Sequence, residues 1–189
     1  MHKYNSKKLT VNTVKEGETV NHIEIESPYA DFSAYRNKDT NEVFYKLTSR
    51  EGACVAILDH QKGKGPVVLL TKNSLDGPPE LPGGYIRPGV DFFDKVLSDT
   101  GVRVIPKNIV KFGEVVGHTE IITPIKLYYT WDFEVKNKDI PGTIIIWTPI
   151  YMAEEMARKG QLRDTSSQQA LYALAYDYRN GYLKPPSRN

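Results

Sequence analysis

Hydrophobic and polar residues alternate or cluster along this chain in patterns that predict a β-rich protein with helices near its C-terminus. Segments that alternate between apolar and polar side chains within residues 20–47 predict a small antiparallel β-unit. Residues 53–58 and 67–70 are apolar at successive positions, as expected of central strands that are covered on both faces. Strict alternation over residues 125–135 and the apolar run 143–147 predict two further strands.

Capping patterns and loop residues predict three helices, which cover residues 91–100, 148–160 and 165–181. The first follows a loop that is rich in glycine and proline. Thr148 is expected to cap the second helix, with Pro149 as its first residue. Thr165-Ser166-Ser167-Gln168 has the pattern of a capping box and is expected to start the third.

The composition is that of a globular protein, because 40% of the 189 residues are hydrophobic and 25% are charged. The 25 basic and 23 acidic residues are scattered, so the basic block that would bind nucleic-acid phosphates is missing and nucleic acid is an unlikely partner. No segment has the length and apolar character of a signal peptide or a membrane span. Cys54 is the one cysteine, which excludes an internal disulfide. We expect a soluble, cytoplasmic protein that does not bind membranes.

The candidate chemistry lies in Glu80-Leu81-Pro82-Gly83-Gly84 and the helix that follows it. Two adjacent glycines let the backbone approach a ligand or an ion, and a helix N-terminus favours negative charge. This order of parts resembles the Nudix box, G-x5-E-x7-R-E-U-x-E-E-x-G-U with U aliphatic, which Glu-Leu-Pro-Gly-Gly precedes in many members. Gly84 takes the place of the first glycine of the box, and Gly101-Val102 takes the place of its end.

The resemblance extends to the ADP-ribose pyrophosphatase branch of the Nudix superfamily. The segment Lys159-Gly160-Gln161-Leu162-Arg163-Asp164-Thr165, which precedes a helix rich in alanine and leucine, is similar to that branch, as is the β-rich N-terminal unit. The resemblance implies an α+β fold, a Nudix-like α/β/α sandwich with a mixed sheet. It divides the chain into an N-terminal β-unit (1–47) that pairs two subunits into a homodimer, a Nudix-like domain (48–183) and a flexible tail (184–189).

The box is shortened and degenerate. Val90 occupies the position of its first glutamate, and Val90 and Gly101 are 11 positions apart, four fewer than in the pattern. Because four residues make about one helical turn, the helix is shortened while its faces stay nearly in phase. Counting back from Gly101, Ser98-Asp99 replace the paired glutamates and Asp94-Lys95 replace the Arg-Glu pair. In the family these glutamates hold Mg²⁺ or Mn²⁺ against a diphosphate.

Lys95 carries the wrong charge for a metal site. On the helix it is four residues from both Asp91 and Asp99, so the ammonium group is expected between two carboxylates on one face. One hypothesis is that Lys95 replaces the metal as the positive group that faces a ligand phosphate. The alternative is an ordinary row of solvated ion pairs, which is the commoner arrangement on an exposed helix face.

Other candidate residues follow from the same resemblance. Glu120 stands roughly where relatives have a catalytic loop glutamate, and it is also consistent with a surface carboxylate. The candidate ligand-binding residues are Arg36, Lys72, Glu80, Gly83, Gly84, Arg87 and Lys95. The residues that could hold Mg²⁺ or Mn²⁺ if the protein is an active hydrolase are Asp91, Asp94 and Asp99.

Three classes of function remain open. The first is a protein that binds a nucleoside-diphosphate-type ligand such as ADP-ribose with weak or no hydrolysis and without a cofactor. The second is an active, metal-dependent Nudix hydrolase that uses a non-standard set of carboxylates. The third is a structural or interaction subunit whose pocket is filled. The missing glutamates favour the first and the third.

Overall fold

The computed structural model describes residues 30–36, 40, 43–49, 51–61, 63–86, 89–116 and 124–183. The chain divides into two compact units, one formed by residues 1–50 with 116–124 and the other by residues 51–115 with 125–189. In the first unit, β1 (Ala30–Arg36) pairs with β2 (Val43–Ser49). The pairing is antiparallel and joins all seven residues of each strand. β2 confirms the strand expected at residues 43–47, and its antiparallel pairing falls within the predicted β-unit, whereas the other expected segment, residues 22–26, lies outside the described residues.

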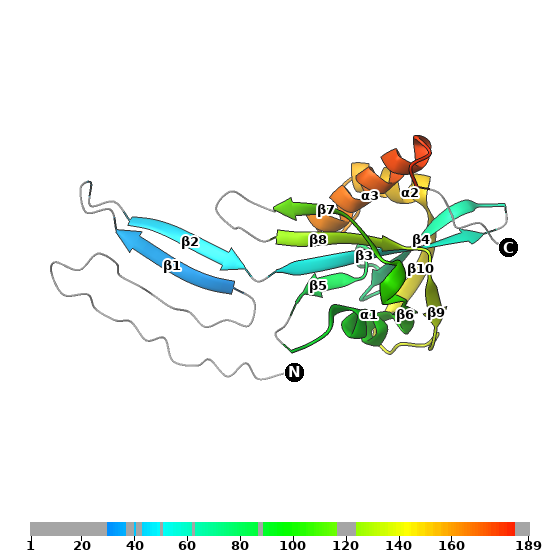
Figure 1. Cartoon of the computed structure of the whole chain (residues 1–189), viewed down its shortest axis with the longest axis horizontal. Coiled ribbons are helices and arrows are strands. Elements are labelled where there is room, and N and C mark those ends of the chain that lie inside the picture. The colour runs from blue at the N-terminus through cyan, green and yellow to red at the C-terminus, as the bar shows by residue number, and fades with distance from the viewer. Residues whose placement is uncertain are drawn as a thin grey trace. The chain divides into compact units, whose positions relative to one another are not determined.

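The second unit is built on a mixed sheet with the strand order β10-β4-β3-β8-β7, to which β5 adds by pairing with β3 (Figure 1). β3 runs parallel to β8 and antiparallel to β4 and β5, and β4 runs antiparallel to β10. The strands are β3 (Gly52–Gln61), β4 (Gly65–Lys72), β5 (Gly83–Tyr85), β7 (Val110–Val116), β8 (Pro124–Thr130) and β10 (Ile144–Pro149). Outside this sheet, β6 (Val102–Val104) pairs with β9 (Phe133–Val135), and Pro106–Asn108 form a 3₁₀ turn.

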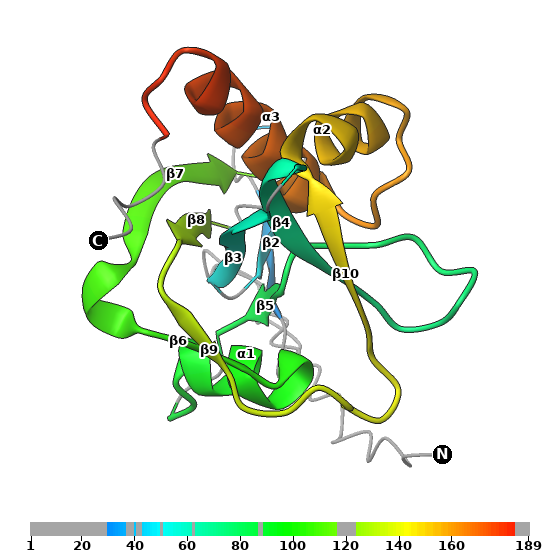
Figure 2. The ribbon, with the colours of Figure 1, turned by 90° about the vertical axis from the view of Figure 1, so that its right-hand side faces the viewer.

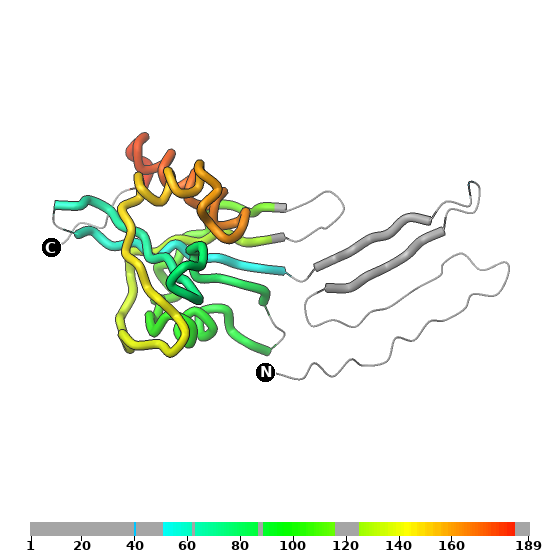
Figure 3. Tube along the Cα trace, turned by 180° about the vertical axis from the view of Figure 1, so that it is seen from behind, coloured from blue at the N-terminus to red at the C-terminus, as the bar shows by residue number. Residues whose placement is uncertain are grey.

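Helices cover both faces of this sheet. α2 (Ile150–Arg158) and α3 (Thr165–Arg179) lie on one side, and α1 (Phe92–Thr100) lies on the other, as Figures 2 and 3 show. The alternation of side chains along β3 explains how the sheet separates two hydrophobic cores. Cys54, Ala56 and Leu58 belong to the core under α2 and α3, whereas Ala53, Val55 and Ile57 belong to the core that contains Phe92 and Val96 of α1. The architecture is the predicted α/β/α sandwich.

Residues 125–135 do not form one strand, and this prediction was wrong. β8 ends at Thr130 and β9 begins at Phe133. The Thr130 hydroxyl accepts a hydrogen bond from the backbone N–H of Asp132 at 3.0 Å, a local side-chain bond that competes with strand pairing. The turn moves the chain between layers, because Tyr129 packs on the α2–α3 core and Phe133 on the α1 core.

The starts of the two C-terminal helices also differ from the prediction. Thr148 and Pro149 are the last residues of β10, and α2 begins after them without a side-chain cap. α3 is capped by Asp164 and not by Thr165, because the Asp164 carboxylate accepts from the backbone N–H of Ser167 at 2.8 Å. Within the described residues, none of the helices is long and apolar enough to span a membrane.

Candidate ligand-binding site

The segment 80–84 is held firmly between the two layers of the second unit. Backbone hydrogen bonds tie it to Thr71 of β4 and Val55 of β3, at 2.8 to 2.9 Å. The Leu81 N–H also donates to the hydroxyl of Ser167 in α3, at 2.9 Å. The Ser167 hydroxyl in turn donates to the Asp164 carboxylate at 2.6 Å. The position of this segment therefore depends on the N-terminus of a helix that is distant in sequence.

Gly83 and Gly84 permit close approaches on either side of β5. A Cβ at Gly83 would lie 2.7 Å from the Ala53 carbonyl oxygen, so a side chain is excluded there. Gly84 has a φ of 140°, and a Cβ there would lie 3.2 Å from Cε of Lys95. The two glycines thus let β5 pair with β3 and let the Lys95 side chain lie against the backbone.

The Lys95 ammonium group binds the backbone of Gly83 and a carboxylate of its own helix. It donates to the Gly83 carbonyl oxygen at 3.0 Å and forms an ion pair with the Asp99 carboxylate. Asp91 is not part of this arrangement, so the predicted row of three charges is in fact a pair. The Asp91 carboxylate caps α1 by accepting from the N–H groups of Phe93 and Asp94, at 2.7 and 3.2 Å.

This capping also corrects the expectation of an anion site at the start of the helix. The first N–H groups of α1 are the groups that would bind a ligand phosphate there. The carboxylate of Asp91 already accepts hydrogen bonds from two of them and places a negative charge at the same point. Two of the first N–H groups of α1 are therefore already bound within the chain.

The described residues in this region offer few ligands for a divalent metal ion. Mg²⁺ requires several oxygen ligands in near-octahedral geometry. Among the described residues, no three histidine, cysteine, aspartate or glutamate side chains are grouped so that they could hold a metal. The Gly83 carbonyl and the Asp99 carboxylate, which are two suitable oxygen ligands, already face the ammonium group of Lys95.

Two hollows among the described residues adjoin the segment 80–84, and a third lies next to them along α1. The lysine hollow, of about 240 Å³, is lined by Thr71, Asn73, Glu80, Pro82, Gly83, Lys95, Asp99, Thr100 and Thr143. The arginine hollow, of about 380 Å³, is lined by Gly52, Ala53, Cys54, Asn73, Glu80, Leu81, Gly83, Gly84, Tyr85, Ile125, Arg163, Asp164, Ser166 and Ser167. The helix hollow, of about 490 Å³, is lined by Tyr85, Ile86, Val90, Asp91, Phe92, Asp94, Lys95, Ser98 and Asp99. Shared residues make the three hollows neighbours.

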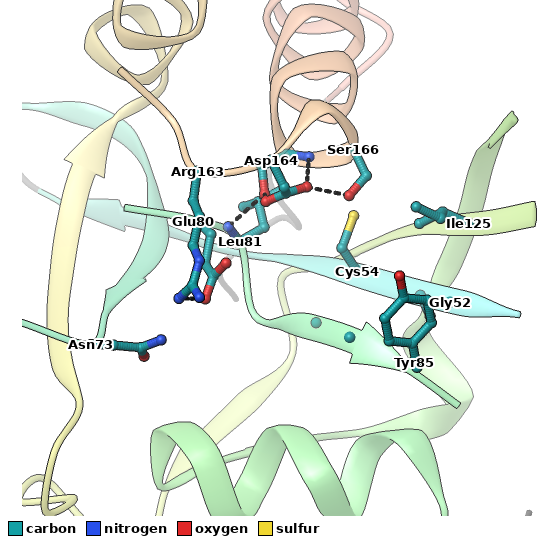
Figure 4. A pocket seen from close by; sticks show the side chains of 14 residues that line it. Gly52, Cys54, Asn73, Glu80, Leu81, Tyr85, Ile125, Arg163, Asp164 and Ser166 are labelled. Carbon is teal, nitrogen blue, oxygen red and sulfur yellow. Dashed lines mark hydrogen bonds and ion pairs between the residues drawn. The ribbon is translucent and has the colours of Figure 1, made fainter. Parts of the chain in front are cut away.

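Glu80 and Arg163 lie side by side at one end of the arginine hollow, and Tyr85 lies at the other end (Figure 4). Nη1 of Arg163 is 3.5 Å from Oε1 of Glu80. Burial raises the pKa of the Glu80 carboxyl above its ordinary value, against the opposing effect of the Arg163 charge. The buried thiol of Cys54 lies between the two ends, and burial raises its pKa to about 12, with a further contribution from the Asp164 carboxylate.

The structure brings together five of the predicted site residues, namely Glu80, Gly83, Gly84, Lys95 and Asp99. Asp91 and Asp94 line the helix hollow together with Lys95 and Asp99. Lys72 does not line any of the three hollows, because its ammonium group donates to the carbonyl oxygen of Leu75 in the turn after β4. Arg36 belongs to β1 in the other unit, where only the backbone is described. Arg87 and Glu120 lie outside the described residues.

Sequence reasoning missed the part of the site that comes from the α2–α3 connection. Arg163, Asp164, Ser166 and Ser167 line the arginine hollow, and none of them was predicted as a site residue. A signal was present, because the segment 159–165 carries the resemblance to the ADP-ribose pyrophosphatase branch. That segment indicates a relation to the branch, but it does not reveal that Arg163 contacts Glu80.

Comparison with known proteins supports the fold. No family model matches the chain, and no curated protein matches its sequence. Among solved structures, the crystal structure of an ADP compounds hydrolase matches with a TM-score of 0.56, over 94% of this chain and 100% of that chain. The two sequences are 12% identical, so the likeness concerns the fold alone. It confirms the predicted α+β class with a mixed sheet between helices.

Proposed function

We propose that the chain binds a nucleoside-diphosphate-type ligand, such as ADP-ribose, around Gly83, without a metal ion and with little or no hydrolysis. The observation that carries the proposal is the position of the Lys95 ammonium group, 3.0 Å from the Gly83 carbonyl oxygen and paired with Asp99. A backbone carbonyl and a carboxylate are ligands of the kind that Mg²⁺ takes. The ammonium group thus occupies a place where a divalent ion would find two of its ligands.

The charges around Gly83 are compatible with a diphosphate. An ammonium group has three N–H donors, and two of those of Lys95 have acceptors among the described residues. The third can donate to a phosphate, and the exposed guanidinium of Arg163 offers further donors across the wall that the two hollows share. Such charge-assisted hydrogen bonds are the strong ones. The fold likeness to an ADP compounds hydrolase favours a ligand of the same chemical kind.

Isothermal titration calorimetry with ADP-ribose, first in EDTA and then in excess Mg²⁺, tests the proposal. We expect binding in EDTA, and a change of less than about twofold in Kd when Mg²⁺ is added. Lys95→Ala should weaken binding about tenfold or more, because a hydrogen bond to a charged group contributes about 1.5–3 kcal/mol. Lys159→Ala is the matched control, since Lys159 also forms an i,i+4 ion pair, with Glu155, on another helix.

Lys95→Glu tests the same position by reversing its charge. The variant has an acid four residues before Asp99, so it should lose metal-free binding and gain binding that depends on Mg²⁺. If Lys95→Ala binds ADP-ribose as the wild type does, Lys95 is only a surface ion pair and the chain is better described as an interaction subunit. Release of phosphate-monoester products by the wild type with Mg²⁺ would instead establish an active hydrolase.

A further inference from the structure

The arginine hollow contains acceptors, above all the Glu80 carboxylate, that a diphosphate bound by Lys95 and Arg163 leaves unused. This hollow shares Asn73, Glu80 and Gly83 with the lysine hollow. A ligand whose phosphates are bound at Lys95 can therefore extend past Glu80 toward the N-terminus of α3. Figure 4 shows the extent of this space, from Glu80 and Arg163 at one end to Tyr85 at the other.

The Glu80 carboxylate is short of hydrogen-bond donors. Its side chain is 28% exposed, so part of its hydration is lost on folding. Within the described residues its side chain has one hydrogen-bond partner, Arg163, at the long distance of 3.5 Å. A carboxylate can accept about four hydrogen bonds. A ligand that brings donors to this point therefore restores hydrogen bonds that the folded chain does not supply.

The charged side chains of the arginine hollow determine which kind of ligand group can donate to Glu80. A further phosphate would find one cationic side chain among the described residues of this hollow, Arg163, which already lies beside Glu80, and it would be repelled by the carboxylates of Glu80 and Asp164. A purely apolar group would bury the Glu80 carboxylate without a partner, which is costly. Neutral hydroxyl groups avoid both penalties, because they donate to a carboxylate and accept from a guanidinium.

We infer that the arginine hollow binds a sugar with neighbouring hydroxyl groups, the ribose next to the diphosphate of the ligand proposed above. The inference rests on that proposed function. Glu80 accepts hydrogen bonds from the two hydroxyls, and Arg163 and Asn73 offer donors beside it. Leu81, which lies beside Glu80, supplies apolar contact for the ring.

ADP and 2′,3′-dideoxy-ADP form a pair of probes that differ only in the two hydroxyls. Calorimetry on the wild-type chain should show that the dideoxy compound binds about tenfold more weakly than ADP. In Glu80→Gln the ratio should fall to about twofold, because an amide has a single oxygen and no charge. Lys95→Ala should weaken both compounds by the same factor, and Glu134→Gln, a change at an exposed glutamate of β9, should alter neither.

The outcomes separate the two proposals. Equal affinity of the wild type for the two probes, with ADP-ribose bound, overturns the sugar site and leaves the proposed function standing. A ratio that stays near tenfold in Glu80→Gln overturns the role of Glu80. If neither ADP nor ADP-ribose binds, the proposed function fails and the sugar site fails with it.

Discussion

At the scale of single residues, Glu80 should give the stability of the protein a distinct pH dependence. Burial raises the pKa of this carboxyl in the folded chain above its ordinary value of 4.5. A raised pKa means that the folded state holds the proton more tightly than the unfolded state does. The contribution to stability is complete below pH 4.5 and is lost as the pH rises through the raised value. Glu80→Gln should therefore become more stable, relative to the wild type, as the pH increases.

Urea unfolding of the wild type and of Glu80→Gln between about pH 4 and pH 8 measures the difference in their stability. Glu134→Gln is the control with the opposite sign, because Lys136 lowers the pKa of Glu134 below its ordinary value. The stability that Glu134 contributes is present at neutral pH and is lost as the pH falls through the lowered value. A difference in stability between the wild type and Glu80→Gln that does not change with pH would contradict the raised pKa of Glu80.

Cys54 is expected to be chemically inert in the folded chain, although it lines the arginine hollow. The residue is 3% exposed, and burial raises the pKa of its thiol to about 12. Because the thiolate is the reactive form, alkylation by iodoacetamide at pH 8 should be negligible in buffer and rapid in denaturing urea. Mass spectrometry after timed quenching gives both rates. Comparable rates in the two solvents would show that the hollow opens to solvent on the time scale of the reaction.

At the scale of secondary-structure elements, Gly101 makes the connection between α1 and β6. It ends α1 with a φ of 67°, and its carbonyl oxygen accepts from the N–H groups of Lys136 and Asn137 at 2.8 and 3.0 Å. A Cβ at this position would lie 2.2 Å from the backbone oxygen of Asn137. Gly101→Ala should therefore lower the free energy of unfolding by about 3 kcal/mol, from backbone strain and from the displacement of the segment after β9 together.

Gly160→Ala separates these two contributions. Gly160 has a φ of 66°, and a Cβ there would meet nothing within 4 Å. This variant carries the strain of a positive φ alone and should cost about 1 kcal/mol. Urea unfolding of the two variants and the wild type gives both values. Equal losses for the two glycines would mean that the segment after β9 can move away from Gly101 at little cost.

Local patterns predicted most elements of the fold, and contacts between distant residues explain where they failed. The apolar runs around Val55 and Leu69 could form only buried strands, and β3 and β4 are such strands. The alternation through Trp131 and Phe133 continues across a turn, so periodicity could not reveal the break that the Thr130 hydroxyl stabilises.

The sequence also predicted the site residues that are close in the chain and missed those that are distant. Glu80, Gly83 and Gly84 form one continuous motif, and Lys95 lies on the helix that follows, so sequence alone could group them. Arg163 reaches Glu80 from 83 positions away, and only the packing of α3 against segment 80–84 brings the two together. The role of Asp91 as a cap also depended on where α1 begins, which spacing did not settle.

At the scale of the whole molecule, the N-terminal unit is the part whose stability needs explanation. Its described strands, β1 and β2, form a two-stranded sheet of seven pairs. Such a ribbon is marginal on its own, and among the described residues neither of its strands pairs with a third one. A second copy of the chain can stabilise it, as the resemblance to dimeric ADP-ribose pyrophosphatases implies. We therefore expect a homodimer that is paired through residues 1–47.

Light scattering after size-exclusion chromatography should give the full chain a mass near twice its 21.4 kDa. A chain that begins at Glu51 lacks β1 and β2 and should run as a monomer, because symmetric pairing needs the same surface on both copies. The core clusters lie within residues 53–183, so thermal unfolding of this shortened chain should remain cooperative and show that its loss of pairing is not a loss of folding. A full chain that keeps the monomer mass over a hundredfold range of concentration would rule the dimer out.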